Sequence, residues 1–192
     1  MSILPNTVAT SKADKEKLLA LLRESQHRFL KSFAGVTDEQ SRRRPAEGSW
    51  SVIDTVEHLT IAEKMMLGLV TGPRRPRAAD APNREEAFLE RMGSRAQKVE
   101  SPEGGRPTGR FTNLAEAADH FRTARENAMR FVEQSAEDLR ATEVTHPHPL
   151  VGNVSTYEML IIMAKHAERH AKQIEEIRNT LSLHADAAKG KS

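Results

Sequence analysis

Apolar side chains recur at helical spacing in four long segments of the chain, and no segment of useful length alternates at strand spacing. The four segments cover about residues 12–34, 51–72, 113–135 and 155–184. In the fourth, for example, one stripe is apolar and the opposite side is rich in Lys and Glu. The pattern predicts four long amphipathic helices and an all-α fold.

Residues that favour helix ends lie at the boundaries of these segments. Ser51 opens the second segment and Asp54 follows three positions later, as in an N-terminal capping box. Ser155 and Glu158 form the same pattern at the start of the fourth segment. Gly35 follows the first segment, where a glycine commonly ends a helix. These signals support the boundaries that the periodicity predicts.

Residues 73–111 connect the second and third segments and are rich in Pro, Gly and Arg. We expect a short helix at about residues 84–93 within them, because a structureless connection of this length is uncommon in a compact domain. The sequence therefore predicts a four-helix bundle with a long crossover between helices 2 and 3. We expect one bundle domain at residues 12–184, a flexible N-terminus at 1–11 and a flexible C-terminal tail at 185–192.

Composition and charge narrow the class of protein. The length of 192 residues suits one domain, and an aromatic content of 4% leaves the core to aliphatic side chains and methionines such as Met65 and Met66. The formal net charge is only +2, so the chain has no overall attraction to nucleic acid or to anionic membranes. Arginine runs at 42–44 and 74–77 have no interleaved aromatic residues. We expect no nucleic-acid partner and no membrane partner.

The chain contains no cysteine, which excludes disulfides, zinc fingers and cysteine nucleophiles. Residues 1–10 lack the basic and apolar regions of a signal peptide. The longest apolar runs, such as residues 159–164, are too short to span a bilayer. We expect a cytoplasmic protein.

Two histidines lie within the apolar stripe of the fourth helix. At about 100° per residue, His166 and His170 fall among the apolar positions and away from the charged side. Side chains at positions i and i+4 stack one above the other, so this pair can share a metal ion. Taken alone, the spacing is equally typical of hydrogen-bonded core histidines.

A third histidine, His58, lies on the apolar side of the second helix about two turns after its start. Three imidazoles that face one core are costly to bury without partners. A divalent ion held by His58, His166 and His170, with one open position, satisfies all three in the arrangement of catalytic zinc sites. The residues therefore predict a three-histidine metal site.

Other classes of site fit the sequence poorly. Glu168 lies two residues after His166, so the fourth helix lacks the HExxH pattern of zinc proteases. No Glu-x-x-His sequence is present, which argues against a di-iron carboxylate bundle. Gly104-Gly105 lacks the strand, lysine and helix of a phosphate-binding loop.

The order and spacing of several elements resemble the DinB/YfiT-like superfamily: Trp50-Ser51, His58, Gly152, Ser155 with Glu158, and His166-x-x-x-His170 with Gln173-Ile174. The resemblance covers about residues 12–184. It implies a bundle with a long crossover and a metal, often nickel or zinc, on the matching positions His58, His166 and His170. Several members are, or are suspected to be, thiol-S-transferases that use bacillithiol, mycothiol or glutathione; a related protein is a mycothiol-dependent maleylpyruvate isomerase. Homodimers are common, so the resemblance also implies a homodimer.

Two classes of function remain open. In the first, the chain is an enzyme whose metal ion activates a low-molecular-weight thiol for S-transfer, or a water for hydrolysis. In the second, the metal only stabilises the bundle, which serves as a binding module. Three protein ligands rather than four favour an open position and hence the enzyme. A cavity that connects the metal to solvent would distinguish the two.

Further polar residues near the predicted site have two interpretations each. His146 and His148 lie in a Pro-rich loop before the fourth helix and line either the mouth of a site or only that loop. Gln173 is placed either to hydrogen-bond a ligand or a bound water, or to lie at a surface rim. Asp54 is placed to orient the imidazole of the second helix, but its role at the helix start is the simpler interpretation.

Overall fold

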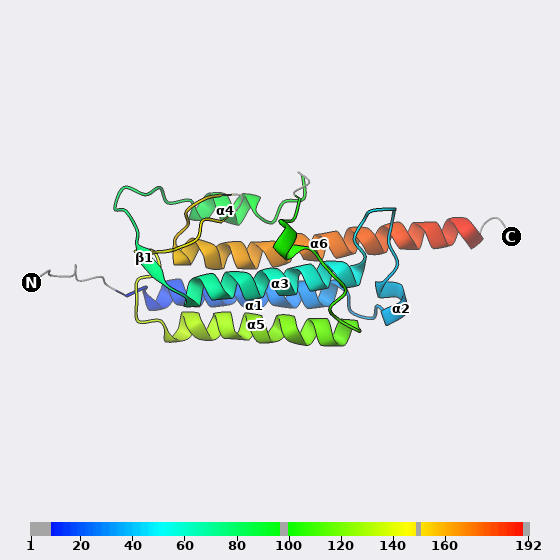
Figure 1. Ribbon diagram of the computed structural model, residues 1–192, viewed down its shortest axis with the longest axis horizontal. Helices are drawn as coiled ribbons and strands as arrows, with labels where there is room; N and C mark the ends of the chain where they lie inside the picture. The colour runs from blue at the N-terminus through cyan, green and yellow to red at the C-terminus, as the bar shows by residue number, and fades with distance from the viewer. Residues whose placement is uncertain (1–8, 97–99, 149–150, 190–192) are drawn as a thin grey trace, which may run out of the picture.

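Four long helices lie side by side in the computed structural model, which confirms the predicted all-α bundle (Figure 1). They are α1 (Lys12–Ser32), α3 (Val52–Thr71), α5 (Leu114–Gln134) and α6 (Thr156–Lys189). The structure describes residues 9–96, 100–148 and 151–189, with side chains as far as residue 182. Within these residues, none of the helices combines the length and the apolar character needed to cross a membrane.

The structure describes only part of the two terminal segments that were predicted to be flexible. Residues 1–8 of the predicted flexible N-terminus and 190–192 of the predicted tail lie outside the described residues. Thr10 is buried, and its hydroxyl accepts a hydrogen bond of 2.8 Å from the backbone N–H of Leu139. At the other end α6 continues to Lys189, past residue 184.

The direction of the helices explains the long crossover. The helices α1 and α6 run one way and α3 and α5 the other (Figure 1). Each helix packs against its parallel partner, and the two pairs meet where α3 packs on α6 and α1 packs on α5. Because α3 and α5 are parallel, the chain must return along the whole bundle between them. The 20 residues of α3 span about 30 Å, at about 1.5 Å per residue, so a short loop cannot make this connection.

The crossover contains local structure of its own. Its helix α4 (Glu85–Arg91) confirms the short helix predicted there and packs on α6. Strand β1 (Arg74–Pro76) pairs antiparallel with β2 (Thr142–Val144), and a 3-10 turn, η1, covers Glu103–Gly105. The two strands and the four-residue helix α2 (Asp38–Ser41) were not predicted, because elements of three or four residues are too short to show a hydrophobic period.

Both predicted capping boxes are present. Ser51 N–H donates to the Asp54 carboxylate over 2.9 Å, and Asp54 N–H donates to the Ser51 hydroxyl over 3.3 Å. Ser155 and Glu158 make the same two bonds, of 2.8 and 3.0 Å. The buried Glu158 also accepts from the Arg77 guanidinium over 3.1 Å, so the start of α6 anchors the beginning of the crossover. The simpler interpretation of Asp54, as a helix cap, is confirmed.

The core consists of two apolar clusters with a polar layer between them. One cluster includes Leu22, Met66 and Met163, and the other includes Phe29 and Phe121. Between the clusters lie three fully buried polar side chains, Ser25, Glu63 and Arg125. Arg125 Nε and Nη2 donate to the Glu63 carboxylate over 3.0 and 2.5 Å, and Arg125 Nη1 donates to Ser25 Oγ over 2.7 Å. The local sequence gives no signal for this buried ion pair.

Candidate metal centre

The structure brings together the three predicted histidines at the interface of α3 and α6. His58 projects from α3, and His166 and His170 project from successive turns of α6. The ring centroid of His58 lies 5.3 Å from that of His166 and 4.7 Å from that of His170, and those of His166 and His170 are 4.5 Å apart. One ring nitrogen of each lies within 4.8 Å of the others, so the three can act as ligands to one ion.

Two of the three imidazoles are oriented by hydrogen bonds at Nδ1, the ring nitrogen that faces away from the other histidines. His58 Nδ1 lies 2.6 Å from the carbonyl oxygen of Gly105, and His170 Nδ1 lies 2.8 Å from Gln173 Oε1. The Gly105 carbonyl can only accept, which places a proton on His58 Nδ1. Gln173 Oε1 also accepts from Arg95 Nη1 over 3.3 Å, which supports its role as acceptor. Both imidazoles therefore present an unprotonated Nε2 to the site, the form that binds a metal.

The third imidazole shows why a cation fits here. His166 Nε2 lies 2.9 Å from His170 Nε2, and His166 Nδ1 is buried with no hydrogen-bond partner among the described residues. If His166 is protonated on Nε2, its Nδ1 is an unsatisfied buried acceptor; if it is protonated on Nδ1, two lone pairs face each other. A divalent ion between the Nε2 atoms would remove the repulsion between lone pairs. The donor set, three neutral nitrogens, is one that zinc or nickel accepts.

Burial lowers the pKa of all three imidazoles. The pKa of His58 is lowered from 6.5 by burial, which the Gly105 carbonyl partly opposes. The pKa values of His166 and His170 lie well below 6.5, first because of burial and then because charge on a neighbouring histidine repels a second proton. Without a metal, the three side chains are therefore neutral near pH 7.

These shifts predict a pH dependence of the metal-free protein. The unfolded chain binds protons on these histidines at a pKa near 6.5, whereas the folded chain binds them only at lower pH. The unfolded state thus holds more protons, so the free energy of unfolding should decrease as pH falls from about 7 to about 5. Urea unfolding of the chelator-treated protein measures this. The His166→Phe variant should show a shallower slope, and an equal slope in both proteins would contradict the assignment.

A cavity of about 1310 Å³ connects the three histidines with solvent. Its apolar walls are formed by Trp50, Met65, Met66, Leu69, Met92 and Ile162, and it also contains Arg95, Arg169 and His148. The Met65 side chain is 55% exposed, so the prediction that Met65 fills the core is wrong: α3 borders the cavity there. Met66, by contrast, is buried as predicted, although it also forms part of the cavity wall. The metal site is therefore reachable from outside.

The other candidate residues divide between the cavity and the surface. His148 lines the cavity, and burial lowers the pKa of its imidazole. The backbone N–H of His148 donates to the carbonyl of Gly152 over 2.8 Å. His146 is exposed. Gln173 lines the cavity, and its Oε1 lies 2.8 Å from His170 Nδ1.

Two residues in the surroundings of His58, one of them in the crossover, were not predicted from the sequence. Gly105 supplies the acceptor for His58, although Gly104-Gly105 was considered only as a phosphate loop. The buried Glu57, next to His58 on α3, binds the backbone of the same segment. A glycine in a Pro-rich connection carries no local sign of the side chain that it will contact, so no sequence signal identified either residue.

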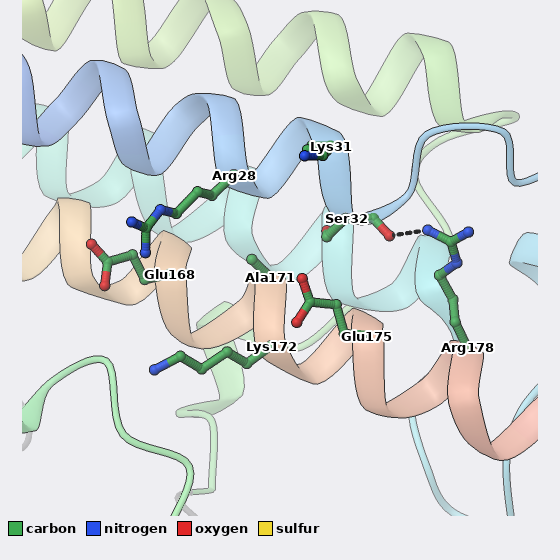
Figure 2. A pocket seen from close by; sticks show the side chains of 8 residues that line it. All are labelled: Arg28, Lys31, Ser32, Glu168, Ala171, Lys172, Glu175 and Arg178. Atoms are coloured by element: carbon green, nitrogen blue, oxygen red, sulfur yellow. Dashed lines mark hydrogen bonds between the residues drawn. The ribbon is translucent and has the colours of Figure 1, made fainter.

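A second hollow, between α1 and α6, has a different character (Figure 2). It has a volume of about 440 Å³ and shares no lining residue with the histidine cavity. Arg178 donates to the Ser32 carbonyl over 2.7 Å, and Glu168 and Glu175 lie among the basic side chains (Figure 2). Because the opposite charges are interspersed, this hollow has no single charge with which to select a ligand.

Comparisons with known proteins agree with this geometry. The sequence matches the profile of the DinB superfamily over residues 21–174. Among solved structures, the chain is similar to YfiT from Bacillus subtilis, described as a probable metal-dependent hydrolase with an unusual four-helix bundle topology. The TM-score is 0.57 at 15% identity over 95% of each chain, which is a likeness of fold. No curated protein matches the sequence.

Proposed function

The chain belongs to the DinB superfamily, and on this premise we propose that it is a metal-dependent enzyme that activates a low-molecular-weight thiol for S-transfer. The observation that carries the proposal is the convergence of three histidines at the wall of a cavity that opens to solvent. A metal that only stabilised the bundle would need no such cavity, and its fourth position would be closed by the protein.

His58, His166 and His170 would hold the ion, which we propose to be zinc or nickel. When bound, a divalent cation with an open position stabilises the deprotonated form of a thiol or water and so supplies a nucleophile near neutral pH. The Gly105 carbonyl and the Gln173 side chain keep the imidazoles of His58 and His170 in the metal-binding orientation.

The cavity suits a substrate with an apolar part. Trp50, whose ring centroid lies 4.8 Å from that of His58, and three methionines provide a wide apolar surface next to the histidines. The cavity opens to solvent, so water within it can take up the proton that the thiol releases. In the transfer, the thiol sulfur forms a bond to an electrophilic carbon of the second substrate while the leaving group of that carbon departs.

Hydrolysis is the second candidate, and the description of YfiT as a probable metal-dependent hydrolase favours it. The same three histidines and the same cavity would then activate water instead of a thiol. The two candidates differ in whether a thiol reaches the ion, and this difference can be measured directly.

We expect a small thiol to change the visible and near-ultraviolet spectrum of the cobalt-substituted protein in a saturable way. The probe is 2-mercaptoethanol, and the matched control is ethylene glycol, which has an oxygen in place of the sulfur. A spectrum that responds to pH and small anions but to no thiol would replace the transferase with the hydrolase. A spectrum that responds to none of them would indicate a closed, structural site and contradict both enzymes.

A further inference from the structure

A buried carboxylate on α3 holds the last part of the crossover in place. Glu57 is 2% exposed, and its two oxygens accept from the backbone N–H groups of Thr108, Gly109 and Arg110 over 2.7, 3.0 and 3.1 Å. Gly109 has φ +77°, a conformation that a glycine adopts readily and that turns successive N–H groups toward one acceptor. Such charge-assisted bonds are strong, and a buried carboxylate that lost them would be left unsatisfied.

The same segment carries the acceptor for His58. Gly105, three residues before Thr108, ends the 3-10 turn and places its carbonyl 2.6 Å from His58 Nδ1. A Cβ on Gly105 would lie 2.9 Å from Ser101 Oγ, so the backbone is closely packed at this point. Because Glu57 and His58 are consecutive on α3, they point in directions about 100° apart, and the crossover segment contacts both.

We infer that Glu57 is a positioning residue for the metal centre. By fixing residues 108–110 on α3, Glu57 keeps the Gly105 carbonyl against His58 and thereby keeps the His58 proton on Nδ1 and its Nε2 free. Gln173 makes the equivalent bond to His170 from within α6, one turn away, and needs no such anchor. His58 differs because its acceptor lies on a distant segment, which Glu57 holds to α3 through bonds to three consecutive backbone N–H groups. The inference rests on the proposed function, since it assigns Glu57 a role at that metal site.

The test compares Glu57→Gln with Glu158→Gln. Glutamine keeps the size of the side chain but replaces one acceptor oxygen with an NH₂ group that faces the backbone donors. Glu158 is a matched control because it is also buried and also anchors the crossover, but through Arg77 and the N–H of Arg84 at the opposite end. Both substitutions should lower the melting temperature, so only a specific readout separates them.

Two readouts address His58 itself. In the metal-free protein, ¹⁵N NMR of the imidazoles should show His58 protonated on Nδ1 in the unmodified chain and in Glu158→Gln, but mixed tautomers in Glu57→Gln. In competition with a chelator, Glu57→Gln should bind zinc about 10–100-fold more weakly, the usual loss when an outer partner of a ligand is removed. Glu158→Gln should bind zinc within about twofold of the unmodified chain.

An unchanged tautomer and unchanged zinc affinity in Glu57→Gln would overturn the inference, and so would equal effects in Glu158→Gln. If Glu57→Gln does not fold, Glu57→Asp keeps the charge but is one methylene too short for all three bonds, and the same two measurements decide. If the unmodified chain binds no metal although the tautomer changes in Glu57→Gln, the proposed function fails and the positioning of His58 stands. If the chain binds metal and the tautomer does not change, the proposed function stands and the role of Glu57 fails.

Discussion

His166→Ala and His170→Ala proteins are expected to bind zinc or nickel more than about 100-fold more weakly than the unmodified chain. Each substitution removes one of three ligands and leaves the other two without the geometry that a divalent ion needs. The loss should exceed the roughly 10–100-fold that follows removal of an outer partner, because a ligand contacts the ion itself. His166→Ala also removes the buried Nδ1 that has no hydrogen-bond partner among the described residues, so part of its cost to the stability of the metal-free protein is offset.

Metal analysis of purified protein, and competition with a chelator of known affinity, measure this. The unmodified chain should carry close to one divalent ion after exposure to zinc or nickel. His27→Ala, on the exposed side of α1, is the control and should keep the ion. An unmodified chain that carries no ion after exposure to either metal would contradict the metal centre, as would an affinity for zinc that survives both substitutions.

Arg125→Met is expected to lower the free energy of unfolding by about 3–5 kcal/mol, which is the usual consequence of removing one partner of a buried ion pair. Arg125 and Glu63 are both 0% exposed, and the guanidinium also donates to the backbone carbonyls of Leu22 and Met163, over 3.1 and 3.2 Å. Without the arginine, Glu63 must remain as an unpaired buried charge or take up a proton. Either change is unfavourable in the interior.

The double variant Glu63→Met/Arg125→Met separates the pair from its surroundings. With both charges gone, Ser25 remains in the layer, where its hydroxyl still donates to the Leu22 carbonyl over 3.1 Å, and most of the lost stability should return. Urea unfolding of the unmodified chain, of the single variants Glu63→Met and Arg125→Met, and of the double variant forms a double-mutant cycle. Arg28→Ala breaks the exposed Arg28–Glu24 pair, whose side chains are 56% and 57% exposed, and should change the stability by less than about 1 kcal/mol. If Arg125→Met lowered the free energy of unfolding by no more than Arg28→Ala does, the role assigned to the buried pair would be contradicted.

The fold could be predicted because its signals are local. The periodic apolar stripes identified the four long helices, and the Ser51 and Ser155 caps located two of their starts. These features depend on side chains three or four residues apart on one helix, which occupy the same face in any surroundings. The short strands and α2 escaped prediction for the same reason, since they are too short to repeat a pattern.

The three histidines could also be predicted, because each lies on the apolar side of its own helix. Their convergence needed only that two apolar stripes face one core. The atoms that orient them could not be predicted. Gln173 was noticed as a neighbour of His170, but its bond to Nδ1 depends on a side-chain rotamer and on Arg95 from the crossover.

What the sequence determined by itself is therefore the helices, their inward faces and the three histidines that those faces carry. The tertiary structure decided which distant groups meet them. Gly105 lies 47 residues from His58, and Arg125 lies 62 residues from Glu63. Such contacts form only when the crossover returns along the bundle and the helices pack. The residues next to His58 or Glu63 in the sequence do not restrict which distant polar group will bond to that side chain. The open cavity likewise exists only where the packed segments leave space beside Met65.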